Sequence, residues 1–328
     1  MIKLIWRTDV HLSDTAPASR TDDWAATVLH KLRQVGQIAT KLKADAVLDG
    51  GDFFHVKSPT RNSHSLVQRV AEVHAQAYGQ IPVYGNVGNH DCVYGDYDFL
   101  NQQPLGVLFS TGVFKRCYDE HEAVFTDETG YTVRVVGVPY HGTTYDMTRF
   151  SRIKKGSEDV LVCMAHVLAS SAGGSMFEGE DIIKYADLEQ YEFDLICCGH
   201  WHKDQGVVTL PNSGKQVVNI GSLTRGALSQ DEMARKPGVA VITCSRELAT
   251  PQIQVVRLPV AEASTVFDVA GRQRQETRAS TMDSFVDNVR RQLVDSVGKQ
   301  DLTEVLATMS DVPDQVRERV LLYLERAV

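Results

Sequence analysis

Residues 45–55 of the chain read DAVLDGGDFFH, and they contain the pattern from which we predict the fold. The apolar run Asp45–Leu48 is short and bounded by turn residues, which is typical of a buried β-strand. It gives way to Gly50-Gly51-Asp52, where glycines allow a sharp turn and a carboxylate follows directly. A buried strand followed by a glycine turn and a reactive side chain is a pattern that recurs along the chain.

Apolar runs of the same kind are found through the first 258 residues, and each predicts a strand. The runs are Ile2–Trp6, Ile81–Val87, Tyr131–Val138, Asp159–Ala165, Asp194–Cys198, Gln216–Ile220, Gly238–Thr243 and Gln252–Leu258.

Two apolar stripes with helical spacing lie between the first strands. Residues 24–42 carry apolar side chains at steps of three and four, which predicts a helix with one buried face. A second stripe covers residues 66–77, and we expect its helix to begin near Ser58-Pro59. Alternating strands and helices predict a sheet covered by helices. The strand-rich part after about Tyr131 predicts a second sheet packed on the first.

The composition is that of a folded globular protein. The chain has 328 residues, of which 43% are hydrophobic and 23% charged, and these values exclude collagen and intrinsic disorder. No apolar run approaches the roughly 18 residues that cross a bilayer, and the charged first residues do not resemble a secretion signal. The six cysteines form no CxxC pair, so we expect free thiols in a reducing cytoplasm.

The charge and the tail bear on possible partners. A net charge of −8 gives no general attraction to nucleic acid, so DNA binding would need local basic patches or metal ions. The composition changes after residue 259, where several arginines occur in a polar stretch and apolar residues with helical spacing follow. We therefore expect a main domain over residues 1–259 and a small C-terminal cap or partner-binding segment, helical or mixed, over residues 260–328.

Polar side chains gather where the predicted strands end. The turns contain Asp9-Val10-His11, Gly50-Gly51-Asp52, Gly88-Asn89-His90-Asp91, His166 and Gly199-His200-Trp201-His202. Ligand sites of open α/β sheets lie at the carboxyl ends of strands, so we expect these side chains to meet. Carboxylate, amide and imidazole groups suit manganese, iron, zinc or magnesium, and the absence of cysteine argues against a structural zinc. Seven ligands suit two ions that share a carboxylate, activate a water and hold a phosphate between them.

Taken in order, the motifs D-x-H, G-D, G-N-H-D, H and G-H-x-H resemble those of the calcineurin-type metallophosphoesterases. The resemblance implies an α/β fold, a two-sheet sandwich flanked by helices. It implies that the first metal ion is held by Asp9, His11, Asp52 and His202, and the second by Asp52, Asn89, His166 and His200, with Asp52 as the bridge.

The same resemblance gives roles to two residues that are not ligands. His90 would contact the phosphate and assist the leaving oxygen. Asp91 would orient His90, as carboxylates commonly do for imidazoles.

Residues 50–66, GGDFFHVKSPTRNSHSL, resemble a segment of the SbcD-type DNA repair and recombination nucleases, including their phage relatives. CCGHWHKDQ at 197–205 and NIGSLTRG at 219–226 are similar to that branch. This resemblance gives His55 a role in the site. It implies two divalent ions, with manganese as the activator and magnesium, iron or zinc as alternatives. It also implies an SbcC-type coiled-coil ATPase as partner, pairing of two subunits and no membrane.

The predicted function is a metal-dependent exo- or endonuclease that hydrolyses phosphodiester bonds in DNA, in the cytoplasm of a bacterium or of a phage-infected host. Candidate DNA contacts are Lys57, Arg61, Arg272, Arg274 and Arg278, although the three tail arginines fit a solvated helix face equally well. Two alternatives stay open. One is a small-molecule phosphodiesterase or phosphatase of the same superfamily, which the net charge favours slightly. The other is a non-catalytic metal-binding subunit of an ATPase complex.

Overall fold

The computed structural model describes residues 1–58, 61–92, 97–171 and 179–271, together with residue 317. Contacts divide the chain into two compact units, Met1–Asp268 and Val269–Val328. All the elements below belong to the first unit, and the helices predicted for the tail fall almost wholly outside the described residues. The boundary predicted after residue 259 stays a prediction.

The first sheet has six strands in the order β14-β13-β1-β2-β3-β4. Their bounds are β1 (Ile2–Arg7), β2 (Ala46–Asp49), β3 (Val83–Gly85), β4 (Lys115–Arg116), β13 (Gly238–Cys244) and β14 (Gln252–Arg257). Strands β1 to β4 run parallel, whereas β13 is antiparallel to β1 and β14 is antiparallel to β13. The loops that follow β1, β2 and β3 therefore leave the sheet at the same edge.

The second sheet has the order β11-β12-β10-β7-β6-β5. Its strands are β5 (Ala123–Thr126), β6 (Thr132–Val138), β7 (Val160–His166), β10 (Leu195–Gly199), β11 (Asp204–Thr209) and β12 (Gln216–Ile220). The four inner strands run parallel, and β5 and β11 are antiparallel edges. Gly199 pairs with His166, so β7 and β10 end side by side.

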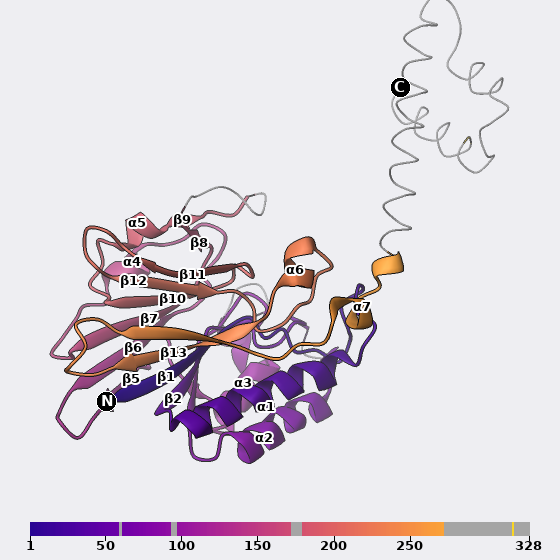
Figure 1. The fold of residues 1–328 in the computed structure, drawn as a ribbon, viewed down its shortest axis with the longest axis horizontal. Coiled ribbons are helices and arrows are strands. Elements are labelled where there is room, and N and C mark those ends of the chain that lie inside the picture. Colours follow the sequence, from indigo (N-terminus) through magenta and orange to yellow (C-terminus); the bar gives the residue numbers. More distant parts are fainter. Residues whose placement is uncertain (59–60, 93–96, 172–178, 272–316, 318–328) are drawn as a thin grey trace, which may run out of the picture. The chain divides into compact units, whose positions relative to one another are not determined.

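Helices cover the outer face of each sheet (Figure 1). On the first sheet lie α1 (Trp24–Leu42), α2 (His64–Ala77), the 3-10 helix η2 (Tyr97–Gln102) and α3 (Pro104–Ser110). On the second lie α4 (Thr148–Ser151), α5 (Tyr185–Leu188) and the short pair β8 (Ala169–Ser170) and β9 (Ile183–Lys184). Two short helices, α6 (Gln230–Ala234) and α7 (Ala263–Val266), occur late in this unit.

The core forms because side chains alternate between the two faces of each strand. In β1, Ile5 packs under α1 and α2, whereas Leu4 and Trp6 pack between the sheets. In β7, Met164 faces the first sheet and Cys163 faces the helices of the second. The predicted fold class, a two-sheet α/β sandwich flanked by helices, is confirmed.

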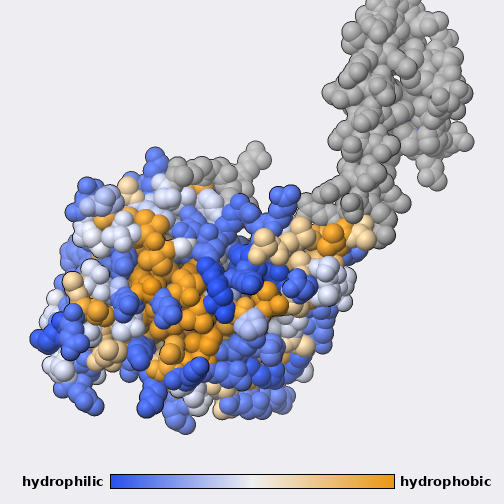
Figure 2. All heavy atoms as spheres, viewed as in Figure 1, coloured by the Kyte–Doolittle hydropathy of each residue, from blue (hydrophilic) through white to orange (hydrophobic). Residues whose placement is uncertain are grey.

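Apolar residues gather on one face over the strands of the sandwich, with hydrophilic residues around them (Figure 2). All six cysteines are free, as predicted, and all six are buried. Among the described residues, the longest helices are too short or too polar to form a membrane span.

The start of α2 differs from the prediction. The helix begins at His64 and is capped by Ser63, whose hydroxyl accepts a hydrogen bond from the Leu66 N–H at 3.0 Å. A serine at this position satisfies an N–H group that has no partner within the helix. Asp14 in turn accepts hydrogen bonds from the Ser63 N–H and hydroxyl, and the helix begins six residues after Ser58 and not beside it.

Candidate metal centre

The loops after β1 and β2 run side by side and bring the first polar residues together. Asp9 N–H donates to the Gly51 carbonyl at 3.1 Å, and His11 N–H donates to the Asp52 carbonyl at 3.0 Å. Asp9, His11 and Asp52 have positive φ angles of 53°, 50° and 52°. Non-glycine residues seldom adopt this left-handed conformation, and each such residue costs on the order of 1–3 kcal/mol. The strain is thus located at the residues predicted as ligands.

Four of the predicted ligands form one compact group: Asp9, His11, Asp52 and His202. One ligand atom from each lies within 4.8 Å of the others. His11 Nε2 lies 3.7 Å from Asp52 Oδ2 and 3.9 Å from Asp9 Oδ1. His202 Nε2 lies 2.9 Å from His11 Nε2 and 3.6 Å from Asp9 Oδ1. These are the residues that the sequence predicts for the first ion.

A second group shares Asp52 with the first and adds His166 and His200. His166 Nε2 lies 3.5 Å from Asp52 Oδ1 and 3.3 Å from Asn89 Oδ1. His166 Nδ1 lies 2.9 Å from the Gly50 carbonyl and donates its hydrogen to it, which leaves Nε2 directed at the group. The structure therefore brings all seven predicted ligands together.

The residues of the two groups fit a pair of divalent ions. Asp52 turns Oδ1 toward one group and Oδ2 toward the other, as a bridging carboxylate must. Its Oδ2 atom is buried, and none of the described residues donates a hydrogen bond to it. A buried carboxylate oxygen without a partner is costly unless a cation binds it. Oxygen and imidazole donors without a thiolate suit hard and borderline divalent ions.

Two glycines are required here by close approach and not by an unusual φ angle. A Cβ on Gly88 would lie 2.1 Å from Asp52 Oδ1. A Cβ on Gly199 would lie 2.3 Å from Thr8 Oγ1 and 3.1 Å from His166 Nδ1. Of the four glycines in these turns, Gly50, Gly51, Gly88 and Gly199, only Gly51 has a positive φ, of 99°. The turn-making role expected from the sequence thus applies to Gly51 alone.

The charges of the group are strongly coupled. Burial would raise the pKa of the Asp52 carboxyl, but His166 and His11 beside it hold this pKa well below its usual value. Burial likewise opposes a proton on His166, yet the Asp52 charge raises the pKa of His166 to about 9. A proton on His166 therefore balances the charge of Asp52. Binding of a divalent ion at Asp52 would displace that proton.

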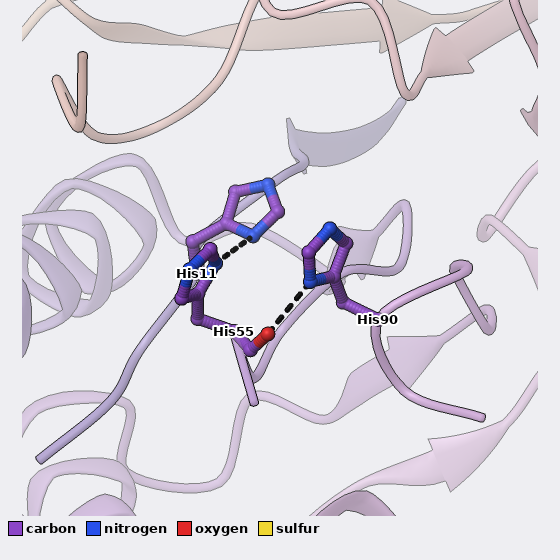
Figure 3. A group of neighbouring side chains, drawn as sticks. All are labelled: His11, His55 and His90. Carbon is purple, nitrogen blue, oxygen red and sulfur yellow. Dashed lines mark hydrogen bonds between the residues drawn. The ribbon is translucent and has the colours of Figure 1, made fainter. Parts of the chain in front are cut away.

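His55 and His90 lie beside the first group (Figure 3). His55 Nδ1 lies 3.3 Å from His11 Nδ1, and His90 Nδ1–H donates to the His55 carbonyl at 2.6 Å. The rings of His55 and His90 stack with centroids 5.0 Å apart and planes 16° apart. A neutral imidazole has one lone pair. If His11 binds the first ion, it cannot also bind another ion together with His55 and His90. His55 and His90 thus lie outside the two groups of predicted ligands.

Asp91 does not have the predicted contact with His90. Its carboxylate accepts N–H hydrogen bonds from Phe53 at 3.1 Å, Phe54 at 3.2 Å and Gly88 at 3.0 Å. It therefore fastens the β2 loop to the β3 loop, and the orientation of His90 is set by the main-chain carbonyl of His55 instead.

A cavity of about 360 Å³ opens beside the first group. His11, His55, His90 and His202 form one wall. The other lining residues are Pro17, Trp24, Lys203, Ser222, Thr224, Gly226, Ala227, Ser229, Asp231 and Glu232. The cavity is large enough for an organic group attached to a phosphate.

Glu180 belongs to this neighbourhood, and the sequence analysis missed it. Its Oε1 lies 2.8 Å from His200 Nε2 and accepts a hydrogen bond from the Tyr145 hydroxyl at 2.8 Å. No sequence signal marks it, because the acidic residues around it follow a glycine- and serine-rich stretch that is typical of a solvated loop.

Lys57 and Arg61, the predicted DNA contacts that the structure describes, do not line the cavity. Lys57 and Arg61 are exposed, and Lys57 lies two residues after His55. Arg272, Arg274 and Arg278 lie outside the described residues.

The family model for calcineurin-like phosphoesterases matches residues 3–204. Comparison with curated proteins finds no match.

Solved structures show a similar fold. A Staphylococcus aureus protein assigned as a 5'-nucleotidase, in complex with alpha-ketoglutarate, is 18% identical with a TM-score of 0.51. The match covers 85% of this chain and only 58% of that protein. A dimetal phosphatase from Danio rerio is 10% identical, with a TM-score of 0.46 and coverage of 79% and 99%. A protein from Thermus thermophilus is 11% identical, with a TM-score of 0.45 and coverage of 78% and 98%.

Proposed function

The chain belongs to the calcineurin-like phosphoesterase family, and from that premise we propose that it is an SbcD-type nuclease that hydrolyses phosphodiester bonds in DNA. The position of His55 carries the proposal. This histidine belongs to the SbcD-like string at residues 50–66, and its ring lies against His11 and stacks on His90. A residue that distinguishes the branch in sequence thus contacts the reaction site.

The chemistry follows from the two groups of ligands. Two divalent ions held by them would supply a nucleophilic water at neutral pH and offset the charge on the phosphate. Manganese is the proposed native ion, with magnesium, iron or zinc as alternatives.

His90 has the geometry of a proton donor. Its Nδ1–H is engaged by the His55 carbonyl, so the proton that can pass to the leaving oxygen is the second one, which the protonated ring carries on Nε2. His55 Nδ1 contacts His11, and both histidines line the cavity, where a nucleoside next to the cleaved bond would lie. The ring of Trp24 and Pro17 give this cavity an apolar wall.

The partners and the compartment are part of the same proposal. We expect an SbcC-type coiled-coil ATPase subunit, pairing of two copies of this chain, and the cytoplasm of a bacterium or a phage-infected host. DNA would be gripped by Lys57 and Arg61 near His55 and by Arg272, Arg274 and Arg278 in the tail.

A small-molecule phosphodiesterase or phosphatase is the second candidate. The net charge of −8 favours it, because an acidic protein has no general attraction for a polyanion. A non-catalytic metal-binding subunit of an ATPase complex is the third candidate, and it predicts no hydrolysis at all.

A substrate panel separates these functions. Purified protein with manganese is incubated with linear duplex DNA, single-stranded DNA, mononucleotides and bis-p-nitrophenyl phosphate. A DNA nuclease degrades DNA and loses DNA affinity steeply with salt, because each phosphate contact releases counterions. Cleavage of the small ester should change little with salt. Hydrolysis of nucleotides without DNA degradation would establish the second candidate, and no hydrolysis would establish the third.

Two sets of variants locate the grip on DNA. Joint Lys57→Ala and Arg61→Ala changes, and joint Ala changes at Arg272, Arg274 and Arg278, should each weaken DNA cutting and flatten its salt dependence. The ester should be cleaved normally, since none of the five is a predicted ligand. Arg33→Ala with Lys41→Ala, two exposed positions on α1, is the matched control. DNA cutting unchanged by both sets would show that neither is the DNA-binding surface.

A further inference from the structure

Two histidines of the second group are each held by a partner at one ring nitrogen. His166 Nδ1 donates to a main-chain carbonyl, that of Gly50, at 2.9 Å. His200 Nε2 lies 2.8 Å from a carboxylate oxygen of Glu180, and both side chains are more than nine-tenths buried. The two imidazoles thus present opposite nitrogens to their partners.

The partner decides which nitrogen of His200 is available to an ion. An ionised carboxylate can only accept hydrogen bonds, so the hydrogen of a neutral His200 ring must be on Nε2. Nδ1 then carries the lone pair, and it is the nitrogen that can join Asp52 and His166. None of the ligand clusters found among the described residues includes Glu180, so its carboxylate acts on the ring and not as a ligand.

Glu180 is itself held in place. The Tyr145 hydroxyl donates to Glu180 Oε1 at 2.8 Å and accepts a hydrogen bond from the Leu168 N–H at 2.8 Å. Leu168 lies two residues after His166, so the chain of contacts connects both histidines of the second group. The His200 main chain is fixed separately, because its N–H donates to the Asp9 carboxylate at 3.1 Å.

We propose that Glu180, supported by Tyr145, is a positioning residue that fixes His200 with Nδ1 directed at the second metal ion. The assignment rests on the proposed two-metal site and is independent of DNA as the substrate. Partners of this kind orient the ligand and raise its basicity, and their loss typically weakens metal affinity about 10–100-fold.

Two measurements on the whole protein test the assignment. The first is nitrogen NMR of the metal-free protein with labelled histidine, assigned with His200→Gln, which reports the protonated ring nitrogen of His200. The second is a calorimetric titration with Mn²⁺ alone. Glu180→Ala should yield a mixture of His200 tautomers and weaken one of two ion sites about 10–100-fold. Glu180→Gln, whose amide oxygen can still accept the Nε2 hydrogen, should keep the tautomer and lose less affinity.

Asp181→Asn is the control, since it removes a neighbouring exposed charge. Tyr145→Phe, which removes one hydroxyl only, should give a smaller loss of metal affinity at the same ion site. It serves as the test if Glu180→Ala does not fold. The proposal is wrong if Glu180→Ala keeps two ion sites of normal affinity and an unchanged His200 tautomer. If Glu180→Ala is unfolded, the same result in Tyr145→Phe would overturn the proposal. Fewer than two ions in the unaltered protein would refute the two-metal site, while the tautomer measurement still judges Glu180.

Discussion

The two sheets hold their halves of the site by different means. The first sheet carries Asp9, His11, Asp52 and Asn89 on loops that are joined to each other through main-chain hydrogen bonds. The second sheet carries its histidines at or just after the ends of β7 and β10. There His200 depends on Glu180 and Tyr145, two side chains from another part of the chain. Main-chain hydrogen bonds and the buried Asp91 carboxylate thus shape the first half, whereas His200 in the second half depends on side chains that a single substitution can remove.

A buried ion pair supports the first half from below. Arg7, the last residue of β1, donates from Nε to Asp49 Oδ2 at 2.7 Å, and both side chains are fully buried. Arg7 also donates to the Tyr78 hydroxyl, and Asp49 Oδ1 accepts from the Gly51 N–H at 3.3 Å. The pair therefore connects the strands to the turn that presents Asp52. The second sheet shows no comparable pair among its described ligand neighbours.

Asp52→Asn should have the largest effect, because this carboxylate joins the two halves. The amide removes the charge that balances both ions, so hydrolysis should fall on the order of 10³-fold or more on every substrate, about 4 kcal/mol in the barrier. The measurement pairs rates with elemental analysis of bound metal. A variant that keeps two ions and more than about a tenth of the rate would show that Asp52 is not the bridge.

His90→Asn should follow, and it separates chemistry from ligation within the first half. The variant should retain both metal ions and lose roughly 10²–10⁴-fold on DNA, the range typical of a general acid. The loss should be smaller on bis-p-nitrophenyl phosphate, whose leaving group needs no proton. Equal losses on the two substrates would remove the leaving-group role from His90.

Arg7→Met tests the support below the first half. It leaves Asp49 buried and uncompensated, which should lower the free energy of unfolding by about 3 kcal/mol in denaturant titrations. Tyr145→Phe, the corresponding change in the second half, removes the two hydrogen bonds of one hydroxyl and should cost about 1–2 kcal/mol. Arg7→Met with Asp49→Leu should recover much of the loss. A cost for Tyr145→Phe equal to that for Arg7→Met would contradict the difference between the two halves.

His74 gives the last prediction, a pH dependence of stability. Burial, with Arg7 nearby, lowers the pKa of His74 to about 3 in the folded protein, against 6.5 for the free side chain. Between those values the unfolded chain binds a proton that the folded protein does not. The free energy of unfolding should therefore fall by up to about 1.4 kcal/mol per pH unit as the pH drops below 6.5.

His74→Phe should remove this contribution while it keeps a ring against Tyr78 and Phe114. The comparison of the two proteins between pH 5 and 7 isolates His74 from the site histidines. Parallel pH profiles would show that His74 is not a buried neutral group.

The sequence predicts those parts that depend on local pattern. Buried strands such as β7 and β10 are continuous apolar runs, and the predicted ligands lie together because parallel strands end at one edge. Two edge strands, β5 and β11, escaped because they are mostly exposed or half-exposed: β5 has one buried position and β11 has none.

Contacts between distant parts of the chain could not be predicted from the sequence either. Arg7 directly follows the predicted apolar run Ile2–Trp6, and nothing there marks its pairing with Asp49, 42 residues away. Glu180 reaches His200 from a stretch without apolar periodicity. Asp91 was assigned to the imidazole beside it, whereas its three partners are main-chain N–H groups. Local patterns cannot specify these partners, because each is chosen by the packed structure.

The positive φ angles at the site have a consequence for laboratory evolution. Glycine would relieve the strained backbone at Asp9, His11 and Asp52, and also at His200, where φ is 81°. A library selected only for thermal resistance should therefore accumulate substitutions at these positions and lose its ligands. Selected variants that tolerate heat better but bind less metal would show this trade-off between stability and metal binding. A screen for this protein must therefore select for ion binding as well as for stability.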